Sequence, residues 1–278
     1  MKVLVTGAAG KLGAEVVRQL QLRRIECLGA DREDFDVRDG AEVHRAVQGY
    51  APDVIVHCAA YTDVERAETE PEKCVEVNGM GTLNVVRAAL AVNAKLMYIS
   101  DAAVFSGEGT TPWEVNDRPN ARSVYGLSKV QGEEAIRSLM TRYFIVRSSW
   151  LYGGDGDDLV QTLMRRSGER GEVAVSTTEF GSPTCVSDLA RLLCDMLTTE
   201  RYGVYHAASQ GYCSQADLAR TVMQQITGRL NLRAVETAPH IGKHPANGRL
   251  STVSLMQGGF ALLPEWEGAL ENYVFAHR

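Results

Sequence analysis

The chain has 278 residues, enough for one large core and a smaller appendage, because single hydrophobic cores stop growing at about 250 to 300 residues. Hydrophobic residues make up 45% and charged residues 23%, which is typical of a globular protein and excludes a disordered or fibrous chain. The formal charge of −6 provides no basic stripe for a phosphate backbone, so no nucleic-acid partner is expected.

No apolar run approaches the length of a membrane span, and the N-terminus "MKVLVTGAAG" does not match a signal peptide. We therefore expect a cytoplasmic protein that does not contact membranes. The six cysteines are widely spaced and form no C-x-x-C pair, which favours reduced thiols over disulfides and predicts no metal site.

The first half of the chain alternates between strand and helix patterns. Residues 2–6 form a β-branched run that leads into glycines, and residues 11–22 have their apolar side chains at helical spacing. The alternation continues with a strand at 25–30, a helix at 40–48, a strand at 53–57, a helix at 72–93, a strand at 95–100, a helix at 124–140 and a strand at 143–149. This order predicts an α/β fold of the Rossmann type, a doubly wound parallel sheet with helices on both faces.

After residue 150 the alternation of strand and helix patterns becomes less regular. Helices are expected at 157–167, 187–199 and 214–227, with a glycine cluster at 153–156 before them. We expect residues 1–150 to form an NAD(P)-binding domain and residues 151–278 to form mainly a smaller α/β substrate-binding part, segments of which could return to the main sheet. A cleft between the two is the natural place for a substrate.

Three glycines, Gly7, Gly10 and Gly13, stand three residues apart between the first strand and its helix. Glycine lets the backbone turn sharply and approach a ligand, and the helix N-terminus beyond it favours a pyrophosphate. Such a turn could instead only pack helix against strand. Its place after the first strand and before a helix favours dinucleotide binding.

An acidic residue, Asp31, ends the second strand 18 residues after Gly13. Its carboxylate could accept hydrogen bonds from ribose hydroxyls, which favours NAD, whereas Arg32 beside it could bind the 2′-phosphate of NADP. The choice between the two cofactors stays open, as does a role for Asp31 as a solvated strand-end acid. Asp36 and Val37 are a possible edge of the adenine site, although a plain turn explains them nearly as well.

Tyr125 and Lys129 lie four residues apart in "VYGLSKVQGEE", so they share one face of a helix. An ammonium beside a tyrosine favours its phenolate, and such a pair can exchange a proton with a carbonyl oxygen while a hydride moves to the carbon. On its own the spacing is usually just an exposed helix face. Together with a dinucleotide-binding turn, the same spacing favours a catalytic pair.

The glycine turn and the Tyr125–Lys129 pair together resemble the extended short-chain dehydrogenases. More narrowly, the chain is similar nearly from end to end to the dTDP-4-dehydrorhamnose reductase family. The segments that carry this likeness are "VTGAAGKLG" (5–13), "PDVIVHCAAYTDVERAE" (52–68), "VNGMGT" (77–82), "YGLSKVQGE" (125–133), "VRSSWLYG" (146–153), "GSPT" (181–184) and "PANGRL" (245–250).

The resemblance implies reduction at C4 of a nucleotide-linked 4-keto-6-deoxy sugar by NADPH or NADH, as in the synthesis of dTDP-L-rhamnose. It implies that Trp150 packs against the sugar, that Asn247 and its neighbours shape the nucleotide end, and that the protein could be a homodimer. Trp150 could instead be a core aromatic residue. The resemblance also implies that the cofactor is lined by Lys11, Leu12, His57, Ala59, Ala60 and Tyr61, although a histidine in the place of His57 is more often a strand-end residue with its hydrogen bonds satisfied than a participant.

The chain departs from the family at residues 100–103. The family reads Ser-Thr-Asp-Tyr there, with the threonine hydroxyl donating a hydrogen bond to the substrate carbonyl, whereas this chain reads Ser100, Asp101, Ala102 and Ala103. An ionised Asp101 would repel the developing oxyanion and raise the pKa of Tyr125; a protonated one could donate as threonine does. Ser100 is expected to point to the opposite face of the strand.

Further departures lie at the substrate end. His244 stands where the family has an arginine, Gly248 where it has a serine, and Gln215 where it has a tryptophan, while Ala102 replaces the family's aspartate. These changes affect substrate contacts more than cofactor contacts, which suits a shifted or lost substrate.

Three functions therefore remain open. The first is an active reductase of a nucleotide-linked 4-keto-6-deoxy sugar, with Tyr125, Lys129 and Asp101 at the reacting carbonyl. The second is a non-catalytic dinucleotide-binding protein that resembles the regulatory subunit of methionine adenosyltransferase. The third is a related sugar-nucleotide reductase or epimerase with a different substrate.

Overall fold

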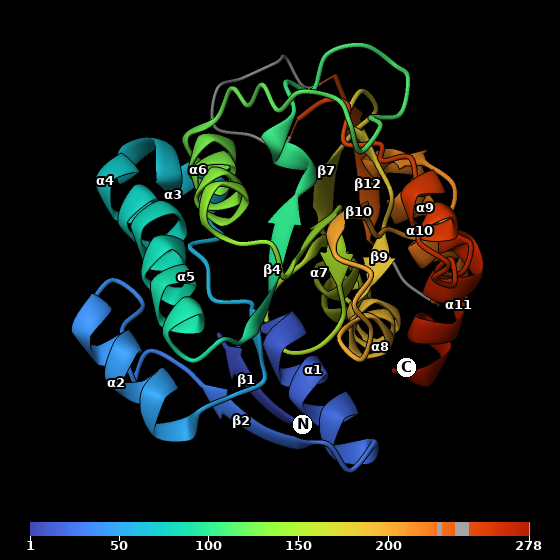
Figure 1. The fold of residues 1–278 in the computed structure, drawn as a ribbon. Helices are drawn as coiled ribbons and strands as arrows, with labels where there is room; N and C mark the ends of the chain where they lie inside the picture. The colour runs from blue at the N-terminus through green and yellow to red at the C-terminus, as the bar shows by residue number, and fades with distance from the viewer. Residues whose placement is uncertain (227–229, 237–244, 278) are drawn as a thin grey trace.

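The computed structural model describes residues 1–226, 230–236 and 245–277, and its centre is a six-stranded sheet (Figure 1). Every neighbouring pair of strands in this sheet is parallel. The strand order is β10 (Gly203–His206), β5 (Tyr143–Ser148), β4 (Lys95–Asp101), β3 (Val54–His57), β1 (Lys2–Thr6) and β2 (Glu26–Ala30). This is the expected doubly wound α/β arrangement. The strand order reverses at β1, which has β2 on one side and β3 on the other.

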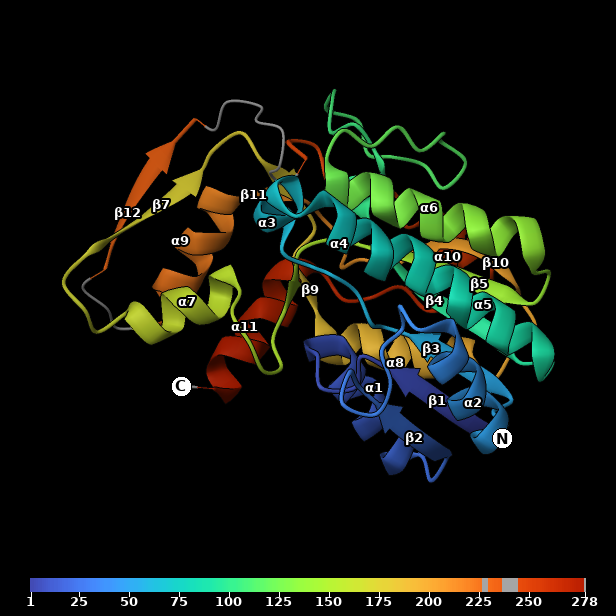
Figure 2. The same cartoon turned by 90° about the vertical axis from the view of Figure 1, so that its left-hand side faces the viewer.

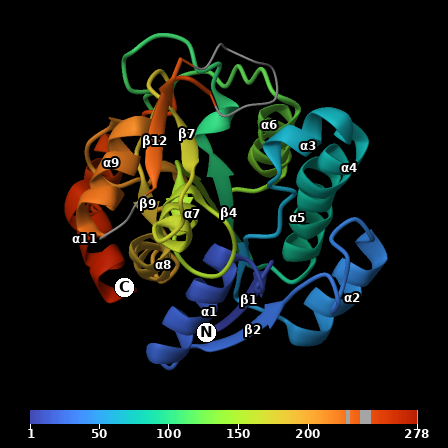
Figure 3. The same cartoon turned by 180° about the vertical axis from the view of Figure 1, so that it is seen from behind.

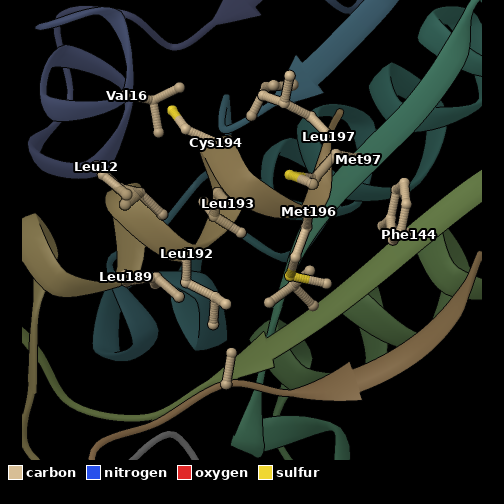
Figure 4. Packing of buried hydrophobic residues seen from close by; sticks show 14 of the residues in the cluster. Leu12, Val16, Met97, Phe144, Leu189, Leu192, Leu193, Cys194, Met196 and Leu197 are labelled. Atoms are coloured by element: carbon tan, nitrogen blue, oxygen red, sulfur yellow. The ribbon is translucent and has the colours of Figure 1, made fainter. Parts of the chain in front are cut away.

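One face of the sheet is covered by α1 (Lys11–Leu22) and α8 (Val186–Met196). Alternate strand residues such as Val3, Val5 and Val56 point to this face, as the two-residue period of a strand requires. Figure 4 shows Leu189, Leu193 and other side chains of α8 packed beside Met97 and Phe144 of the strands. Truncating a buried leucine here would cost about 2 to 5 kcal/mol.

The other face is covered by α2 (Gly40–Tyr50), α5 (Thr82–Ala91) and α6 (Val124–Leu139), which pack against Leu4, Ile55, Leu96 and Ile145. The helix expected at 72–93 is interrupted by a π-helical turn, Glu76–Gly81, between α4 (Pro71–Val75) and α5. A short helix that the sequence did not reveal, α3 (Val64–Thr69), precedes it.

The smaller part stands beside the main sheet, as Figure 2 and the rear view in Figure 3 show. Its helices share a core with β7 and β12, a parallel pair that was not expected. Its elements are β6 (Leu151–Tyr152), α7 (Leu159–Arg166), β7 (Glu172–Ser176), β8 (Phe180–Gly181), β9 (Thr184–Cys185), β11 (Cys213–Ser214), α9 (Gln215–Gln225), β12 (Asn231–Val235) and α11 (Trp266–Ala276).

The second half of the chain also contributes to the main sheet. Strand β10 pairs with β5, helix α8 covers one face, and α10 (Val253–Gln257) packs beside β10. In sheets of this kind, ligands bind at the carboxyl ends of the strands beside the point where the order reverses. Among the described residues, no helix has the length and apolar content that a membrane crossing requires.

Candidate active site

The turn after β1 and the start of α1, residues 7–13, form a glycine cradle, in which the three glycines leave the backbone without side chains. Gly7 has φ +68°, and a β-carbon on it would come within 2.6 Å of the Ala59 nitrogen. A β-carbon on Gly13 would collide with the Gly7 carbonyl group. Only glycine fits these two positions, so the N-terminus of α1 stays open toward the carboxyl ends of β1 and β3. This cradle suits the pyrophosphate of a dinucleotide.

Asp31 is fixed at the end of β2 beside this turn. One carboxylate oxygen accepts the backbone N–H of Ala9 at 2.8 Å, and the other accepts the N–H of Arg32 at 2.8 Å. The Arg32 side chain is exposed, with its Nε 3.6 Å from the Asp36 carboxylate. Asp36 is bound more closely by Arg38, whose guanidinium lowers the pKa of that carboxyl group. Charges of both signs therefore border the place expected for the cofactor ribose.

A cavity of about 970 Å³ runs from the glycine turn to α6 and the smaller part. This volume is at the upper end of the range for small-molecule sites and suits a dinucleotide with a second ligand. Its walls include most of the side chains predicted from the sequence: Gly7, Gly10, Lys11, Leu12, Gly13, Asp31, Arg32, Asp36, Val37, Ala59, Ala60, Tyr61, Asp101, Tyr125, Lys129 and Trp150.

Tyr125 and Lys129 reach this cavity from the first turns of α6. Ser123 caps the helix by accepting the N–H of Gly126 at 3.0 Å. A β-carbon on Gly126 would collide with the Ala103 carbonyl oxygen, so glycine allows the helix start to pack tightly against the end of β4. This packing sets Tyr125 near Asp101.

The ammonium of Lys129 is buried at the cavity wall. Its Nζ donates a hydrogen bond to the Ile99 carbonyl oxygen at 2.7 Å and lies 4.2 Å from the centre of the Tyr98 ring. Burial lowers the pKa of Lys129 to about 8, although the charges of Asp101 and Glu133 oppose that shift. Burial also raises the pKa of Tyr125, and the charge of Asp101 raises it further. Tyr125 therefore holds its proton firmly in the absence of ligands.

Asp101 is the last residue of β4 and caps the short 3₁₀ helix Ala102–Val104. One of its carboxylate oxygens accepts the N–H of Ala103 at 2.8 Å. Its side chain borders the cavity together with Tyr125 and Lys129. Asp101 thus lines the same cavity as Tyr125 and Lys129, and its charge acts on both of them.

Ser100 does not supply a substitute hydroxyl group. Its Oγ donates to Glu133 at 2.7 Å, and Glu133 is held by the fully buried guanidinium of Arg147 at 2.7 Å. This ion pair is buried between α6 and β5. Ser100 is among the residues that line the cavity, but the proton of its hydroxyl group is taken up by the hydrogen bond to Glu133.

Three residues implied by the resemblance are not among those that line the cavity. His57 is buried between Thr6 and Thr82, and burial lowers its pKa to about 3, so it is neutral. Ala102 packs against Val104, Phe105 and Leu250 in a small apolar cluster.

The third of them is Asn247, whose side chain binds backbone within the protein. Its amide nitrogen donates to the carbonyl oxygens of Thr111 at 2.8 Å and Glu108 at 3.3 Å. Asn247 therefore holds the 107–113 loop in place and does not reach the cavity. His244 lies outside the described residues.

Trp150 lines the cavity in an unusual backbone conformation, with φ +44°. Its indole lies against Gly181, where a β-carbon would come within 2.6 Å of the ring. A bulky residue in the left-handed region costs about 1 to 3 kcal/mol, which is found mainly at functional sites. The geometry suits a side chain that is held in place to contact a ligand.

The sequence did not predict the loop that roofs the glycine turn. Residues 155–160 line the cavity opposite Gly10 and Lys11. The Lys11 ammonium donates to the Asp158 carboxylate at 2.6 Å and to the Asp157 carbonyl oxygen at 2.8 Å. The glycine cluster at 153–156 was the available signal, because Gly153, Gly154 and Gly156 all have positive φ. Gln215 also borders the cavity, from the N-terminus of α9.

Comparison with known proteins places the chain in a family. The family model described as the RmlD substrate binding domain matches residues 1–278. The chain belongs to this family. The spore coat polysaccharide biosynthesis protein SpsK of Bacillus subtilis is 32% identical, over 98% of this chain and 96% of that protein. A dTDP-4-dehydrorhamnose reductase of Mycolicibacterium smegmatis is 33% identical, over 99% of this chain and 85% of that protein.

A solved structure gives the same result. The dTDP-4-dehydrorhamnose reductase of Bacillus anthracis, in complex with NADP, superposes with a TM-score of 0.95 and 34% identity, over 100% of this chain and 99% of that one. The expected resemblance and the Rossmann-type fold are therefore confirmed, and so is the expected class, an NAD(P)-dependent oxidoreductase.

Proposed function

We propose that the protein reduces the C4 keto group of a nucleotide-linked 4-keto-6-deoxy sugar, with NADPH or NADH as the reductant. The relatives named as dTDP-4-dehydrorhamnose reductases support this proposal, as does the relative in complex with NADP. The observation that carries it is the position of Tyr125 and Lys129 beside Asp101, in the same cavity as the glycine cradle.

The reaction needs a hydride at carbon and a proton at oxygen. A nicotinamide cofactor held at the glycine turn would supply the hydride. Tyr125 donates its phenolic proton to the carbonyl oxygen, so that the C=O group becomes CH–OH. Lys129, which lies one helical turn further along α6 and lines the same cavity, would stabilise the phenolate left behind, and solvent would return the proton to Tyr125. Its position also suits a hydrogen bond to the nicotinamide ribose.

Asp101 decides how well this proton transfer works. As a carboxylate it raises the pKa of Tyr125, which makes the phenol a weaker acid, and it repels the oxygen as negative charge develops. As a carboxylic acid it donates a hydrogen bond to that oxygen, and an acid in an apolar site can serve in this way. We therefore assign the activity to the form with Asp101 protonated.

The smaller part would bind the sugar nucleotide. Trp150 enters the cavity at the boundary between β5 and β6, and Gln215 and Leu218 of α9 line the same wall. We propose residues 1–150 as the cofactor-binding domain and most of residues 151–278 as the substrate-binding part, with α8 and β10 belonging structurally to the main sheet.

A second candidate is a dinucleotide-binding regulatory protein without catalysis. The observation that favours it is the charge of Asp101 beside Tyr125, which opposes proton donation. Cofactor binding without turnover of any nucleotide-linked keto sugar would favour this candidate. Turnover of an unrelated sugar nucleotide would instead indicate a reductase or epimerase of different specificity.

The test is a reductase assay with dTDP-4-dehydrorhamnose and either cofactor. Loss of NADPH or NADH absorbance, with formation of the 4-hydroxy sugar, is the expected result. The matched control is the same incubation with a dTDP sugar that carries a hydroxyl group at C4. Cofactor binding with no oxidation at any pH would refute the proposal.

A further inference from the structure

Arg249 is a half-buried cation of the segment 245–250, and no role of its own was expected for it from the sequence. The carbon of its guanidinium lies 4.0 Å from the centre of the Phe180 ring, and its Nη1 donates to the Asn247 side-chain oxygen at 3.0 Å. Asn247 is itself fixed by the carbonyl oxygens of Thr111 and Glu108. Arg249 is therefore held in one orientation, and its other guanidinium nitrogens make no hydrogen bond within the described residues.

The charge of Arg249 has no carboxylate partner in the described part of the chain. Residues 227–229, 237–244 and 278, which lie outside it, contain no aspartate or glutamate side chain. Burial lowers the pKa of Arg249, and only the Tyr212 phenol opposes that shift. Taking a cation out of water without an anion is unfavourable, so this arrangement is explained if a ligand brings the negative charge.

Arg249 is not itself among the residues that line the cavity, but its neighbours connect it to residues that are. A β-carbon on its neighbour Gly248 would be 3.5 Å from Ser149 Oγ and 3.9 Å from the Ala102 β-carbon. Ser149 and Ala102 directly adjoin Trp150 and Asp101, which line the cavity. On the other side, Phe180, the residue stacked on Arg249, precedes Gly181, which supports the Trp150 indole.

We propose that Arg249 binds the diphosphate group of the sugar nucleotide. This inference rests on the proposed function, because C1 and C4 lie on opposite sides of a pyranose ring. With the C4 carbonyl oxygen at Tyr125, the diphosphate on C1 points away from Tyr125 toward the outer residues of the site. The planar guanidinium offers paired N–H groups that match two phosphate oxygens, and the Phe180 ring orients it before the ligand arrives.

A purely structural role is the alternative, in which Arg249 only stacks on Phe180 and braces Asn247. Arg201 provides a matched control for this possibility. It also stacks on an aromatic ring, Phe260, at 5.6 Å, and it donates to the carbonyl oxygens of Gly258 and Gly259. It is exposed and precedes β10, at the amino end of that strand, whereas the cavity lies at the carboxyl ends.

The test is calorimetric titration of the full-length chain with dTDP, in the wild type and in Arg249→Gln, Arg249→Lys and Arg201→Gln. We expect Arg249→Gln to weaken dTDP binding by about tenfold or more, and Arg249→Lys to retain part of the affinity. Arg201→Gln should bind as the wild type does. NADH affinity should be unchanged in all three variants, which also shows that each is folded. Unchanged dTDP affinity in Arg249→Gln, or an equal loss of NADH affinity, would overturn the proposal.

The dTDP titration separates this inference from the proposed reduction. If dTDP binding depends on Arg249 but no keto sugar is reduced, the inference stands and the proposed reaction fails. If the wild type reduces dTDP-4-dehydrorhamnose and Arg249→Gln has the same KM, the reaction stands and the inference fails. A raised KM with little change in kcat is the expected result, because the diphosphate is remote from the reacting carbon.

Discussion

The negative charge of Asp101 acts directly on the proposed acid, Tyr125. After burial, it is the largest cause that raises the pKa of the Tyr125 phenol. The same charge raises the pKa of Lys129 against the stronger effect of burial. The Asp101 charge therefore raises the pKa of both members of the proposed catalytic pair.

Removing the Tyr125 hydroxyl should stop the reduction without disturbing the cofactor. We expect Tyr125→Phe to lower kcat by at least about a hundredfold, because a general acid typically contributes that much. NADH binding, followed by fluorescence titration, should change little. Tyr143→Phe, at the amino end of β5, is the matched control and should keep full activity. Undiminished turnover in Tyr125→Phe would remove Tyr125 from the mechanism.

A single methyl group in the glycine cradle should abolish dinucleotide binding. In Gly13→Ala the new β-carbon would collide with the Gly7 carbonyl group, so the turn must open. We expect a loss of about 2 kcal/mol or more in the free energy of unfolding, together with loss of NADH binding. Gly49→Ala is the control, since nothing lies within 4 Å of a β-carbon there. It should stabilise α2 by up to about 1 kcal/mol. Normal cofactor titration of Gly13→Ala would contradict the placement of the pyrophosphate.

The choice between NADH and NADPH should depend on Asp31 and Arg32 in opposite directions. The Asp31 carboxylate is oriented by the N–H groups of Ala9 and Arg32 and would repel a 2′-phosphate. We expect Asp31→Ser to shift the ratio of dissociation constants toward NADPH by about tenfold. Arg32→Ala should weaken NADPH binding and leave NADH binding unchanged. Equal effects of either substitution on both cofactors would show that the ribose lies elsewhere.

Cofactor affinity should fall as pH rises through the pKa of Lys129. That pKa is about 8, so the ammonium proposed to hold the ribose is present below this pH and is lost above it. Removing the Asp101 charge in Asp101→Asn takes away an attraction that favours the ammonium. The fall should then begin at a lower pH in the variant, as NADH titrations at a series of pH values would show. A midpoint that stays in place or moves upward would contradict the assigned coupling.

The main sheet and the cofactor half of the site could be predicted because their signals are local. The glycine turn lies between adjacent elements, and the four-residue spacing of Tyr125 and Lys129 places both on one face of α6. Asp31 follows from its place at the end of β2. These relationships need only a strand, a turn or a helix, all of which leave regular patterns in the sequence.

The features that the sequence did not reveal depend on contacts between distant segments. The Lys11–Asp158 ion pair joins residues 147 positions apart. Arg249 contacts Phe180 only because the segment around Asn247 lies beside β8. Asn247 and its neighbours were expected to shape the nucleotide end, and nothing in the sequence indicated that the Asn247 amide binds the 107–113 loop. For His57, at the end of β3, the sequence left open a cofactor contact and a strand-end role, and the hydrogen bonds with Thr6 and Thr82 that hold it in the core agree with the strand-end role.

The most direct test of the account is the pH dependence of dTDP-4-dehydrorhamnose reduction in the wild type and in Asp101→Thr, between about pH 5 and pH 9. The account predicts that wild-type kcat/KM is highest at the acid end and falls as pH rises, because the active form has Asp101 protonated. Asp101→Thr should be faster near neutral pH. Its profile should stay flat until Lys129 loses its proton, at a pH below the value of about 8 that the Asp101 charge helps to maintain in the wild type. Parallel profiles for the two proteins would contradict the account, and turnover by Asp101→Thr alone would show a reductase scaffold that Asp101 has disabled.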